Sequence, residues 1–280
     1  MSCANAALSA KNLDVSIPGR TLVRQLDVEF STGEFVAVLG QNGAGKTLTL
    51  HTLAGLRPAP GELHLFGADL RTLPRRAIAR RLALLPQTSE DLFPATVFDT
   101  ALIGRHPHVK PLGLQSDEDY DIARNCLREM SLGSFADRDV ATLSGGERRR
   151  LAIAQTLAQT PQVFLLDEPL NHLDPQHQLD VLELFARQAR DGATVVATLH
   201  DVNLAIRFAD RCLLLFGDGR WEVGEAAEIL TAERLSQLYD VQVETVDWRG
   251  FPVFVTAGSA RADASGGRDH ADPRSVDKTA

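Results

Sequence analysis

The sequence predicts an α/β fold in which helices accompany a mostly parallel sheet. Short apolar runs rich in β-branched residues, such as FVAVL at 35–39, recur along the chain. Segments of helical composition separate most of these runs, and strands that alternate with helices form parallel sheets. The region 96–139 interrupts the alternation, because it holds helix formers and no strong strand pattern. We therefore expect an inserted helical subdomain there.

The individual elements follow from periodicity and composition. Partial alternation of apolar and polar residues predicts strands at 8–15 and 21–30, and the continuous apolar run at 35–39 predicts a buried strand. Further strands are expected at 61–66, 82–85, 163–166, 194–198 and 212–216. Helices are expected at 47–56, 74–81, 146–158, 175–190, 202–209 and 232–239. The segment 221–255 is expected to add short strands around the last of these helices.

Composition limits the class of protein. The 280 residues are 44% apolar, enough for a large core, and the net charge of −8 argues against nucleic acid as the main partner. Three cysteines without a CxxC spacing predict reduced thiols. No secretory signal is expected, since the N-terminus lacks a basic start before an apolar run. No apolar run approaches the roughly 20 residues that span a bilayer.

A glycine-rich motif follows the apolar run at 35–39 and precedes a predicted helix. It fits the pattern G-x-x-x-x-G-K-[ST], whose backbone N–H groups surround phosphates at the start of a helix. The lysine would reach the β- and γ-phosphates, and the threonine hydroxyl would bind Mg²⁺. We expect a purine nucleoside triphosphate with Mg²⁺ on Gly40, Gln41, Asn42, Gly43, Ala44, Gly45, Lys46 and Thr47.

Two carboxylates end a second apolar strand, in the sequence VFLLDEP. A buried parallel strand delivers Asp167 to the carboxyl edge of the sheet beside the glycine-rich loop, where it suits Mg²⁺. The adjacent Glu168 could accept a proton from water that attacks the γ-phosphate. His200 ends the next apolar strand and is expected to contact the γ-phosphate. The pair His106-x-His108 is too weak a pattern to predict a metal site.

The order of the motifs GQNGAGKT, LLPQ, LSGGE, VFLLDEP, HLD and TLH resembles the ATP-binding subunit of ABC transporters, over roughly residues 5–245. The resemblance implies a P-loop NTPase core with a mixed, largely parallel sheet, an antiparallel β-subdomain and a helical subdomain. A nucleotide-binding domain is thus expected at 5–256, its helical subdomain at about 96–139 extending into the helix after 146. The tail 257–280 has almost no large apolar residue and is expected to be disordered.

The resemblance also assigns roles. Asp167, Glu168 and His200 match the magnesium ligand, the general base and the γ-phosphate sensor. Gln87 matches the glutamine that touches Mg²⁺ and senses the membrane partner. The expected catalytic set is therefore Glu168, His200 and Gln87, and the expected magnesium set is Thr47, Gln87 and Asp167. Together they imply an ATPase that couples hydrolysis to transport.

The stretch LSGGERRRL at 143–151 contains no catalytic side chain, although a glycine pair opens its helix. The resemblance implies that Ser144, Gly145 and Gly146 contact ATP held by a second subunit, and that Asp174 links the two sites of a homodimer. Glycine would let the phosphate approach the backbone closely. The arginines at 148–150 are expected to form a solvated helix face.

Three departures from the family pattern stand out. Ile17 lies where the family commonly places an aromatic ring under adenine, and an aliphatic side chain can pack on the purine but lacks the ring-stacking contribution to base affinity. The motif reads LSGGE rather than LSGGQ, a change we do not expect to abolish function. Leu170 follows Glu-Pro where threonine is frequent, and no physical consequence follows from it.

The run LIGRHPH at 102–108 resembles importers of iron chelates, haem and vitamin B12. That group couples two ATPases to an integral-membrane permease dimer and, indirectly, to a periplasmic substrate-binding protein. The chain is then expected to be peripheral, bound through its permease at the cytoplasmic face of the inner (plasma) membrane. The cargo, a siderophore, haem or a corrinoid, is not encoded here. The alternatives are an exporter ATPase subunit and a soluble ABC ATPase of translation or repair, although the latter usually carry two ATPase units or long coiled coils.

Overall fold

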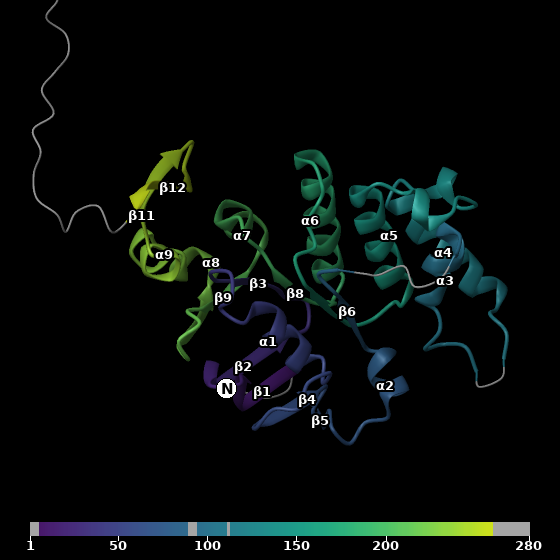
Figure 1. Cartoon of the computed structure of the whole chain (residues 1–280), viewed down its shortest axis with the longest axis horizontal. Helices are drawn as coiled ribbons and strands as arrows, with labels where there is room; N and C mark the ends of the chain where they lie inside the picture. Colours follow the sequence, from purple (N-terminus) through teal and green to yellow (C-terminus); the bar gives the residue numbers. More distant parts are fainter. Residues whose placement is uncertain (1–5, 89–93, 111–112, 260–280) are drawn as a thin grey trace, which may run out of the picture. The chain divides into compact units, whose positions relative to one another are not determined.

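The computed structural model describes residues 6–88, 94–110 and 113–259. The chain divides into two compact units, the first ending at Leu230 and the second beginning at Thr231. Figure 1 labels most of the elements of both units. Each unit is described by itself below, and the site lies in the first.

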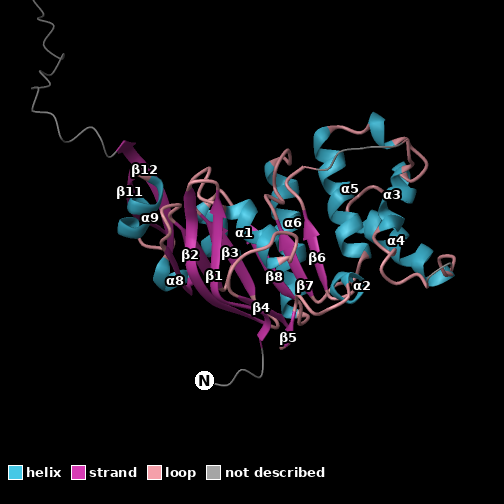
Figure 2. Ribbon diagram, turned by 60° about the horizontal axis from the view of Figure 1, so that its bottom comes forward, coloured by secondary structure: helices cyan, strands magenta, loops and turns pink. Residues whose placement is uncertain are grey.

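The centre of the first unit is a six-stranded sheet in the order β10-β9-β3-β8-β7-β6. Strands β3, β8, β7 and β6 are labelled in Figure 2. Five of the strands are parallel, and β10 is antiparallel to β9. The parallel, partly mixed sheet that the sequence predicts is therefore confirmed. The strands are β3 (Phe35–Leu39), β6 (Leu82–Leu85), β7 (Val163–Leu166), β8 (Thr194–Thr198), β9 (Arg211–Leu215) and β10 (Trp221–Glu225).

The central strands read as continuous apolar runs because they are covered on both faces. Every residue of β3, β7 and β8 is buried. Helix α6 (Pro175–Arg190) packs on this sheet, and the Phe185 ring meets the Phe164 ring of β7 edge-on at 5.4 Å. Such burial leaves only the strand ends for polar chemistry. The other helices of the sheet layer are α1 (Lys46–Leu53), α2 (Arg75–Ala79), α7 (Val202–Phe208) and α8 (Ala226–Ile229).

A second, antiparallel sheet has the order β2-β1-β4-β5. Its long strands alternate buried and exposed residues over much of their length, as expected for a sheet with one packed face. This sheet corresponds to the antiparallel β-subdomain that the resemblance implies. Its strands are β1 (Ala6–Ile17), β2 (Arg20–Ser31), β4 (Glu62–Leu65) and β5 (Ala68–Asp69).

Between Thr96 and Asp139 the described residues form helices and no strand. The α-helices are α3 (Val97–Ile103) and α4 (Asp117–Glu129), and the short 3₁₀ helices Gly133–Phe135 and Val140–Thr142 precede α5 (Gly145–Ala158). Ser116 and Ser144 begin α4 and α5 with reciprocal capping boxes, which fix where each helix starts.

The second unit contains α9 (Ala232–Tyr239) and a hairpin of β11 (Val241–Trp248) and β12 (Phe251–Ser259). The Val243 N–H donates to the Ser236 hydroxyl at 2.9 Å and ties the hairpin to α9. Strand β12 covers the first three residues of the expected tail, and the remainder, 260–280, lies outside the described residues. Within the described part of the chain, no helix is both long and apolar enough to cross a bilayer.

Candidate functional site

The glycine-rich loop connects β3 to α1, as predicted. Gly40, Gly43 and Gly45 all have positive φ angles, which glycine adopts without strain. A Cβ atom at Gly40 would lie 2.4 Å from the Leu215 carbonyl oxygen, so a side chain there would displace the loop or β9. The glycines thus let the loop turn tightly at the carboxyl edge of the sheet, before the start of α1.

Lys46 is the first residue of α1 and is buried. Its Nζ donates to the carbonyl oxygens of Gly40, at 2.7 Å, and Gln41, at 3.2 Å. Burial lowers the pKa of this ammonium, while the nearby Glu168 and Asp167 carboxylates raise it. The cation is therefore held inside the loop and faces the acidic strand end across it.

Asp167 follows β7 and is fully buried. Its Oδ1 accepts a hydrogen bond from the Thr198 hydroxyl at 2.9 Å. Among the described residues its Oδ2 is buried and has no hydrogen-bond partner. A buried carboxylate oxygen without a partner is costly unless a cation or donor meets it, so this atom fits a magnesium ligand.

Glu168 is the centre of a hydrogen-bond cluster. Its Oε1 lies 2.9 Å from His200 Nε2, and its Oε2 accepts from Gln87 Nε2, at 2.9 Å, and from Asn171 Nδ2. Burial raises the pKa of this carboxyl, but the hydrogen bonds from Asn171, His200 and Gln87 and the charge of His200 outweigh it, and the net pKa is lowered. Glu168 is therefore a carboxylate at neutral pH.

The Glu168 backbone is unusual for a residue with a side chain. Its φ angle of 47° lies in the left-handed region, which costs on the order of 1–3 kcal/mol and persists only where neighbours enforce it. The Thr198 hydroxyl accepts a hydrogen bond from the Glu168 N–H at 2.6 Å. Thr198 thus holds both acidic residues, through one oxygen.

These groups border a cavity of about 440 Å³. Most of the predicted residues come together here, including Ile17, which is 39% exposed and supplies an aliphatic wall. The predicted residues that line the cavity are Ile17, Asn42, Gly43, Gly45, Lys46, Thr47, Gln87, Glu168 and His200. A phosphate loop, a buried carboxylate and a hydrogen-bonded glutamate at one sheet edge can bind a nucleotide and activate water.

Eight predicted residues are not among those that line this cavity. Gly40, Gln41 and Ala44 belong to the loop after β3, Asp167 follows β7, and the other four lie elsewhere. Ser144, Gly145 and Gly146 form the start of α5, and Asp174 is the N-cap of α6, where it accepts from the His177 N–H at 2.9 Å. Gly146 lies against the next segment, since a Cβ there would be 3.0 Å from the His172 carbonyl oxygen. Within one chain these two helix starts are therefore neighbours, and their residues do not line the cavity beside the loop Gly40–Thr47.

The expected solvated face at residues 148–150 is wrong. Arg149 is buried, and Arg148 and Arg150 are half-buried. Arg149 turns inward because carbonyl oxygens of the loops after β6 and β7 accept its hydrogen bonds. A run of three arginines gives no sign of this, since the acceptors are main-chain atoms far away in the sequence.

Sequence reasoning also missed Asn171 and Thr198. Thr198 reads only as the end of an apolar strand, and Asn171 as one polar residue in the run N-H-L-D. The position of Asn171, three residues after Glu168, is the one signal that the sequence offers for it.

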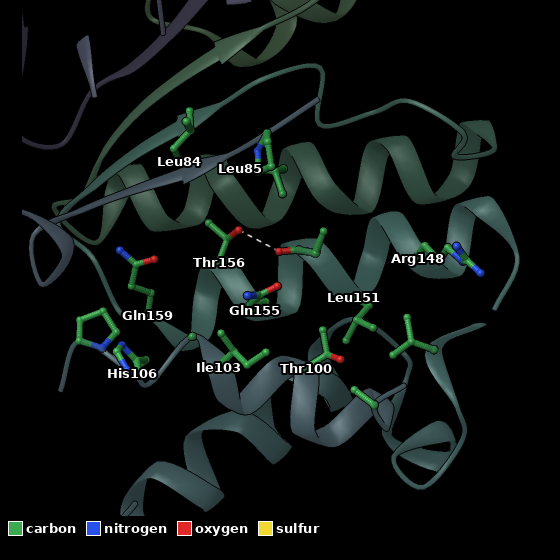
Figure 3. A pocket seen from close by; sticks show the side chains of 16 residues that line it. Leu84, Leu85, Thr100, Ile103, His106, Arg148, Leu151, Gln155, Thr156 and Gln159 are labelled. Atoms are coloured by element: carbon green, nitrogen blue, oxygen red, sulfur yellow. Dashed lines mark hydrogen bonds between the residues drawn. The ribbon is translucent and has the colours of Figure 1, made fainter. Parts of the chain in front are cut away.

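A second hollow, of about 600 Å³, lies between β6, α3 and α5. Figure 3 shows Leu84 and Leu85 on one side, Thr156, Gln155 and Leu151 of α5 in the middle, and Ile103 and Thr100 below. Its wall includes Pro86, which directly precedes Gln87. The hollow is mostly apolar and touches the segment that carries a catalytic candidate.

Comparison with known proteins matches residues 23–171 to the family model of the ABC transporter. The hemin import ATP-binding protein HmuV of Rhodopseudomonas palustris is 40% identical and the match covers 85% of this chain and 89% of that protein. The iron(3+)-hydroxamate import ATP-binding protein FhuC of Bacillus subtilis is 34% identical, covering 86% and 90%.

Solved structures agree with these matches. A metal-chelate type ABC transporter in an inward-facing conformation is 30% identical, with a TM-score of 0.78, covering 90% of this chain and 98% of that one. A bacterial ABC transporter cassette solved as a dimer is 27% identical, with a TM-score of 0.66, covering 77% and 97%. The chain therefore belongs to the ABC transporter family, as an ATP-binding subunit that hydrolyses ATP.

Proposed function

We propose that this chain energises the import of an iron chelate, either a siderophore or haem, through a separate permease, with a vitamin B12-type corrinoid as the second candidate cargo. Relatives named for hemin, iron(3+)-hydroxamate and petrobactin import support the iron-chelate class. The hydrolytic part rests on one observation above all, the hydrogen-bonded contact of Gln87 and His200 with Glu168 beside the phosphate loop.

In the proposed reaction the loop Gly40–Thr47 holds the triphosphate, and Lys46 Nζ exchanges its carbonyl acceptors for phosphate oxygens. Glu168 accepts the proton of the attacking water, and His200 lies beside it toward the γ-phosphate. Ile17 packs on the purine without the stacking that an aromatic ring would add.

Thr47, Gln87 and Asp167 would hold Mg²⁺, and the buried Oδ2 of Asp167 without a partner among the described residues is the observation that fits this ion. When bound, Mg²⁺ neutralises charge on the β- and γ-phosphates. The Thr198 hydroxyl fixes the orientation of the Asp167 carboxylate through Oδ1.

The functional unit is proposed to be a homodimer of this chain. Ser144, Gly145 and Gly146, together with Asp174, contact ATP bound on the second copy. Their place outside the chain's own cavity supports this reading, as does the start of α5, where backbone N–H groups and the helix dipole favour an anion.

The dimer predicts a separation of binding from association. Changing Gly145 to Asp should leave ATP binding by isolated subunits nearly intact and abolish ATP-driven dimerisation, because the carboxylate repels the γ-phosphate of the partner's ATP. Monomer folding should survive, since the atom nearest to a Cβ at Gly145 would be His172 Cβ, at the ordinary contact distance of 3.6 Å. Nucleotide titration and size-exclusion chromatography measure the two properties.

Ser134→Asp adds the same charge at an exposed position of the helical region and is the matched control. It should dimerise normally. Loss of monomer ATP binding by Gly145→Asp with dimerisation preserved would contradict the proposed role.

The permease is proposed to dock a cytoplasmic segment in the second hollow, between β6, α3 and α5. The hollow is mostly apolar and is walled by Pro86, next to Gln87, so a segment seated there reaches the peptide that carries a catalytic candidate. The chain would then lie at the cytoplasmic face of the inner membrane, held by its permease, while a periplasmic binding protein delivers the cargo.

Uptake in the source organism tests the proposal. Deleting the gene should abolish uptake of one labelled cargo among ferric siderophore, haem and cobalamin. The unaltered chain should restore that uptake, whereas Glu168→Gln should not. Normal uptake of all three in the deletion strain would contradict import and favour the exporter or soluble alternatives.

Ile103→Glu tests the docking of the permease, because Ile103 lines the hollow between β6, α3 and α5. This variant should retain ATP hydrolysis as an isolated chain and fail to restore uptake.

A further inference from the structure

Arg149 is a buried cation whose hydrogen bonds, among the residues that the structure describes, all go to main-chain carbonyl groups. Its side chain rises from the second turn of α5, and the residue is 5% exposed. Nη1 donates to Pro86 O, at 2.6 Å, and to Gln87 O, at 3.3 Å. The remaining donations are from Nη2 to Asp167 O at 2.5 Å and Glu168 O at 2.7 Å, and from Nε to Pro169 O at 3.3 Å.

The five carbonyl groups belong to two loops that follow neighbouring strands. Strands β6 and β7 pair in parallel, with Leu85 beside Leu166, and the loops leave the sheet at the same edge. The Asp167 N–H donates to Leu85 O at 2.9 Å, which is the last ladder contact between the two chain segments. Beyond it, the guanidinium of Arg149 joins the main-chain carbonyl groups of Gln87 and Glu168, while the side chains of these two residues meet in a separate hydrogen bond.

The hydrogen bonds of Arg149 are made to the strained backbone around Glu168. Glu168 has its φ of 47° between two peptides whose carbonyl groups both accept from Nη2. Together with Thr198, which accepts from the Glu168 N–H, Arg149 holds the peptide groups on both sides of this residue. Strained backbone persists where the surroundings over-determine it, and these contacts supply that condition.

Arg149 stays charged while it does so. Burial lowers the pKa of its guanidinium to about 10, against the attraction of the Asp167 and Glu168 carboxylates. At neutral pH the cation therefore lies behind the two acidic residues and offsets their mutual repulsion. A planar fork with five N–H donors can serve five acceptors on two loops at once, whereas lysine offers three donors and glutamine two.

We propose that Arg149 is a positioning residue that fixes the peptides of Gln87 and Glu168 relative to each other and to α5, and so sets the reactive geometry of Glu168. This inference rests on the proposed role of Glu168 as the base. It also makes Arg149 the connection between the catalytic loops and the helix whose first turn is proposed to contact ATP on the second copy.

The test compares Arg149→Gln and Arg149→Lys with Arg150→Gln in the full-length chain. Arg150 is the next residue of α5, is half-buried, and donates to Met130 O at 3.1 Å rather than to the catalytic loops. Misplacing a catalytic group by about 1 Å can cost about 100-fold in rate, so Arg149→Gln should lower kcat for Mg·ATP by about 10- to 100-fold. KM should change by less than about 3-fold, because Lys46 and Thr47 keep their positions.

Arg149→Lys should recover part of kcat, since it keeps the charge and some of the donors, and Arg150→Gln should keep kcat within about 2-fold. Three outcomes would overturn the inference: an unchanged kcat in Arg149→Gln, a rise of KM that accounts for the whole loss, or equal losses in Arg149→Gln and Arg150→Gln. Failure of both Arg149 variants to fold beside a folded Arg150→Gln would assign a structural role and would overturn it as well. Unchanged turnover in Glu168→Gln would instead remove the proposed role of Glu168 itself.

Discussion

Replacing Glu168 with glutamine should lower the turnover of Mg·ATP by about 100- to 10,000-fold, the range that follows from losing a general base. The amide is nearly isosteric with the carboxylate, so the contacts with Gln87, His200 and Asn171 can largely be retained or inverted. The proton acceptor, however, is gone. Steady-state hydrolysis by the purified chain measures the effect.

The binding of ATP separates a catalytic role from a structural one. The Glu168→Gln chain should bind ATP as tightly as the unaltered chain, since Lys46 and the glycine-rich loop are untouched. Glu183 provides a matched control, because it is an exposed carboxylate on α6, and Glu183→Gln should hydrolyse ATP normally. Turnover that stays unchanged in Glu168→Gln would refute the assignment of Glu168 as the base.

Replacing Arg105 with methionine should destabilise the fold by about 3–5 kcal/mol, because it leaves a buried carboxylate without its cation. Arg105 Nε lies 2.8 Å from Asp119 Oδ1, and the two side chains are 7% and 10% exposed. Nη1 also donates to Ala158 O, at 2.8 Å, and to Thr160 Oγ1, at 2.9 Å. Arg105, which lies in the run LIGRHPH that resembles the iron-chelate importers, thus joins α4 to the end of α5. Urea unfolding measures the loss.

Two further variants test this explanation. Arg71 pairs with Asp69 at the surface, where solvent screens the attraction, so Arg71→Met should cost far less stability than Arg105→Met. Adding Asp119→Asn to Arg105→Met should recover part of the stability, since it removes the uncompensated charge and keeps an acceptor for the Ser116 N–H. Equal losses in Arg105→Met and Arg71→Met would show that the buried pair contributes no more than the exposed one.

Acidity should modulate the same pair in a defined direction. Burial raises the pKa of Asp119, but hydrogen bonds from Ser116 and Arg105 and the charge of Arg105 outweigh it, and the net pKa is lowered. The pair therefore stabilises the unaltered chain above the unfolded pKa of about 3.9, and this contribution is lost as pH falls through the folded value. In Arg105→Met the lowering contribution of the arginine is gone, while burial and the Ser116 hydrogen bonds still act, so the pKa of Asp119 is higher than in the unaltered chain. The stability deficit of that variant should therefore be smaller at pH 4.5 than at pH 7.

Most of the central fold could be predicted because its signals are local. A strand covered on both faces must be apolar throughout, so β3, β7 and β8 can be recognised in the sequence as short apolar runs. The glycine-rich loop at Gly40–Thr47 can also be recognised from the sequence, since one short segment supplies the groups expected to surround the phosphates. The order of the six strands, with β6 at one edge and β10 at the other, depends on pairing between distant segments. No single segment of the sequence predicts it.

The candidate site is predictable where side chains would act directly and hidden where they act on other protein groups. Glu168 and His200 stand at strand ends and are recognisable by residue type. Thr198 and Asn171 matter because they orient Glu168, and their sequence positions carry no comparable signal. A run of basic residues usually lies at the surface, whereas distant carbonyl oxygens determine the burial of Arg149.

The chemical nature of the groups that accept hydrogen bonds from Arg149 has a consequence for the evolution of this sequence. In the described part of the chain Arg149 has five acceptors, and all are main-chain carbonyl groups, which every amino acid possesses. The guanidinium therefore places no demand on the identity of the residues it contacts. Apart from Gln87, Asp167 and Glu168, whose side chains have roles of their own, the residues of the loops after β6 and β7 can thus change without a compensating change at position 149. A connection of this kind leaves no paired substitutions between related sequences.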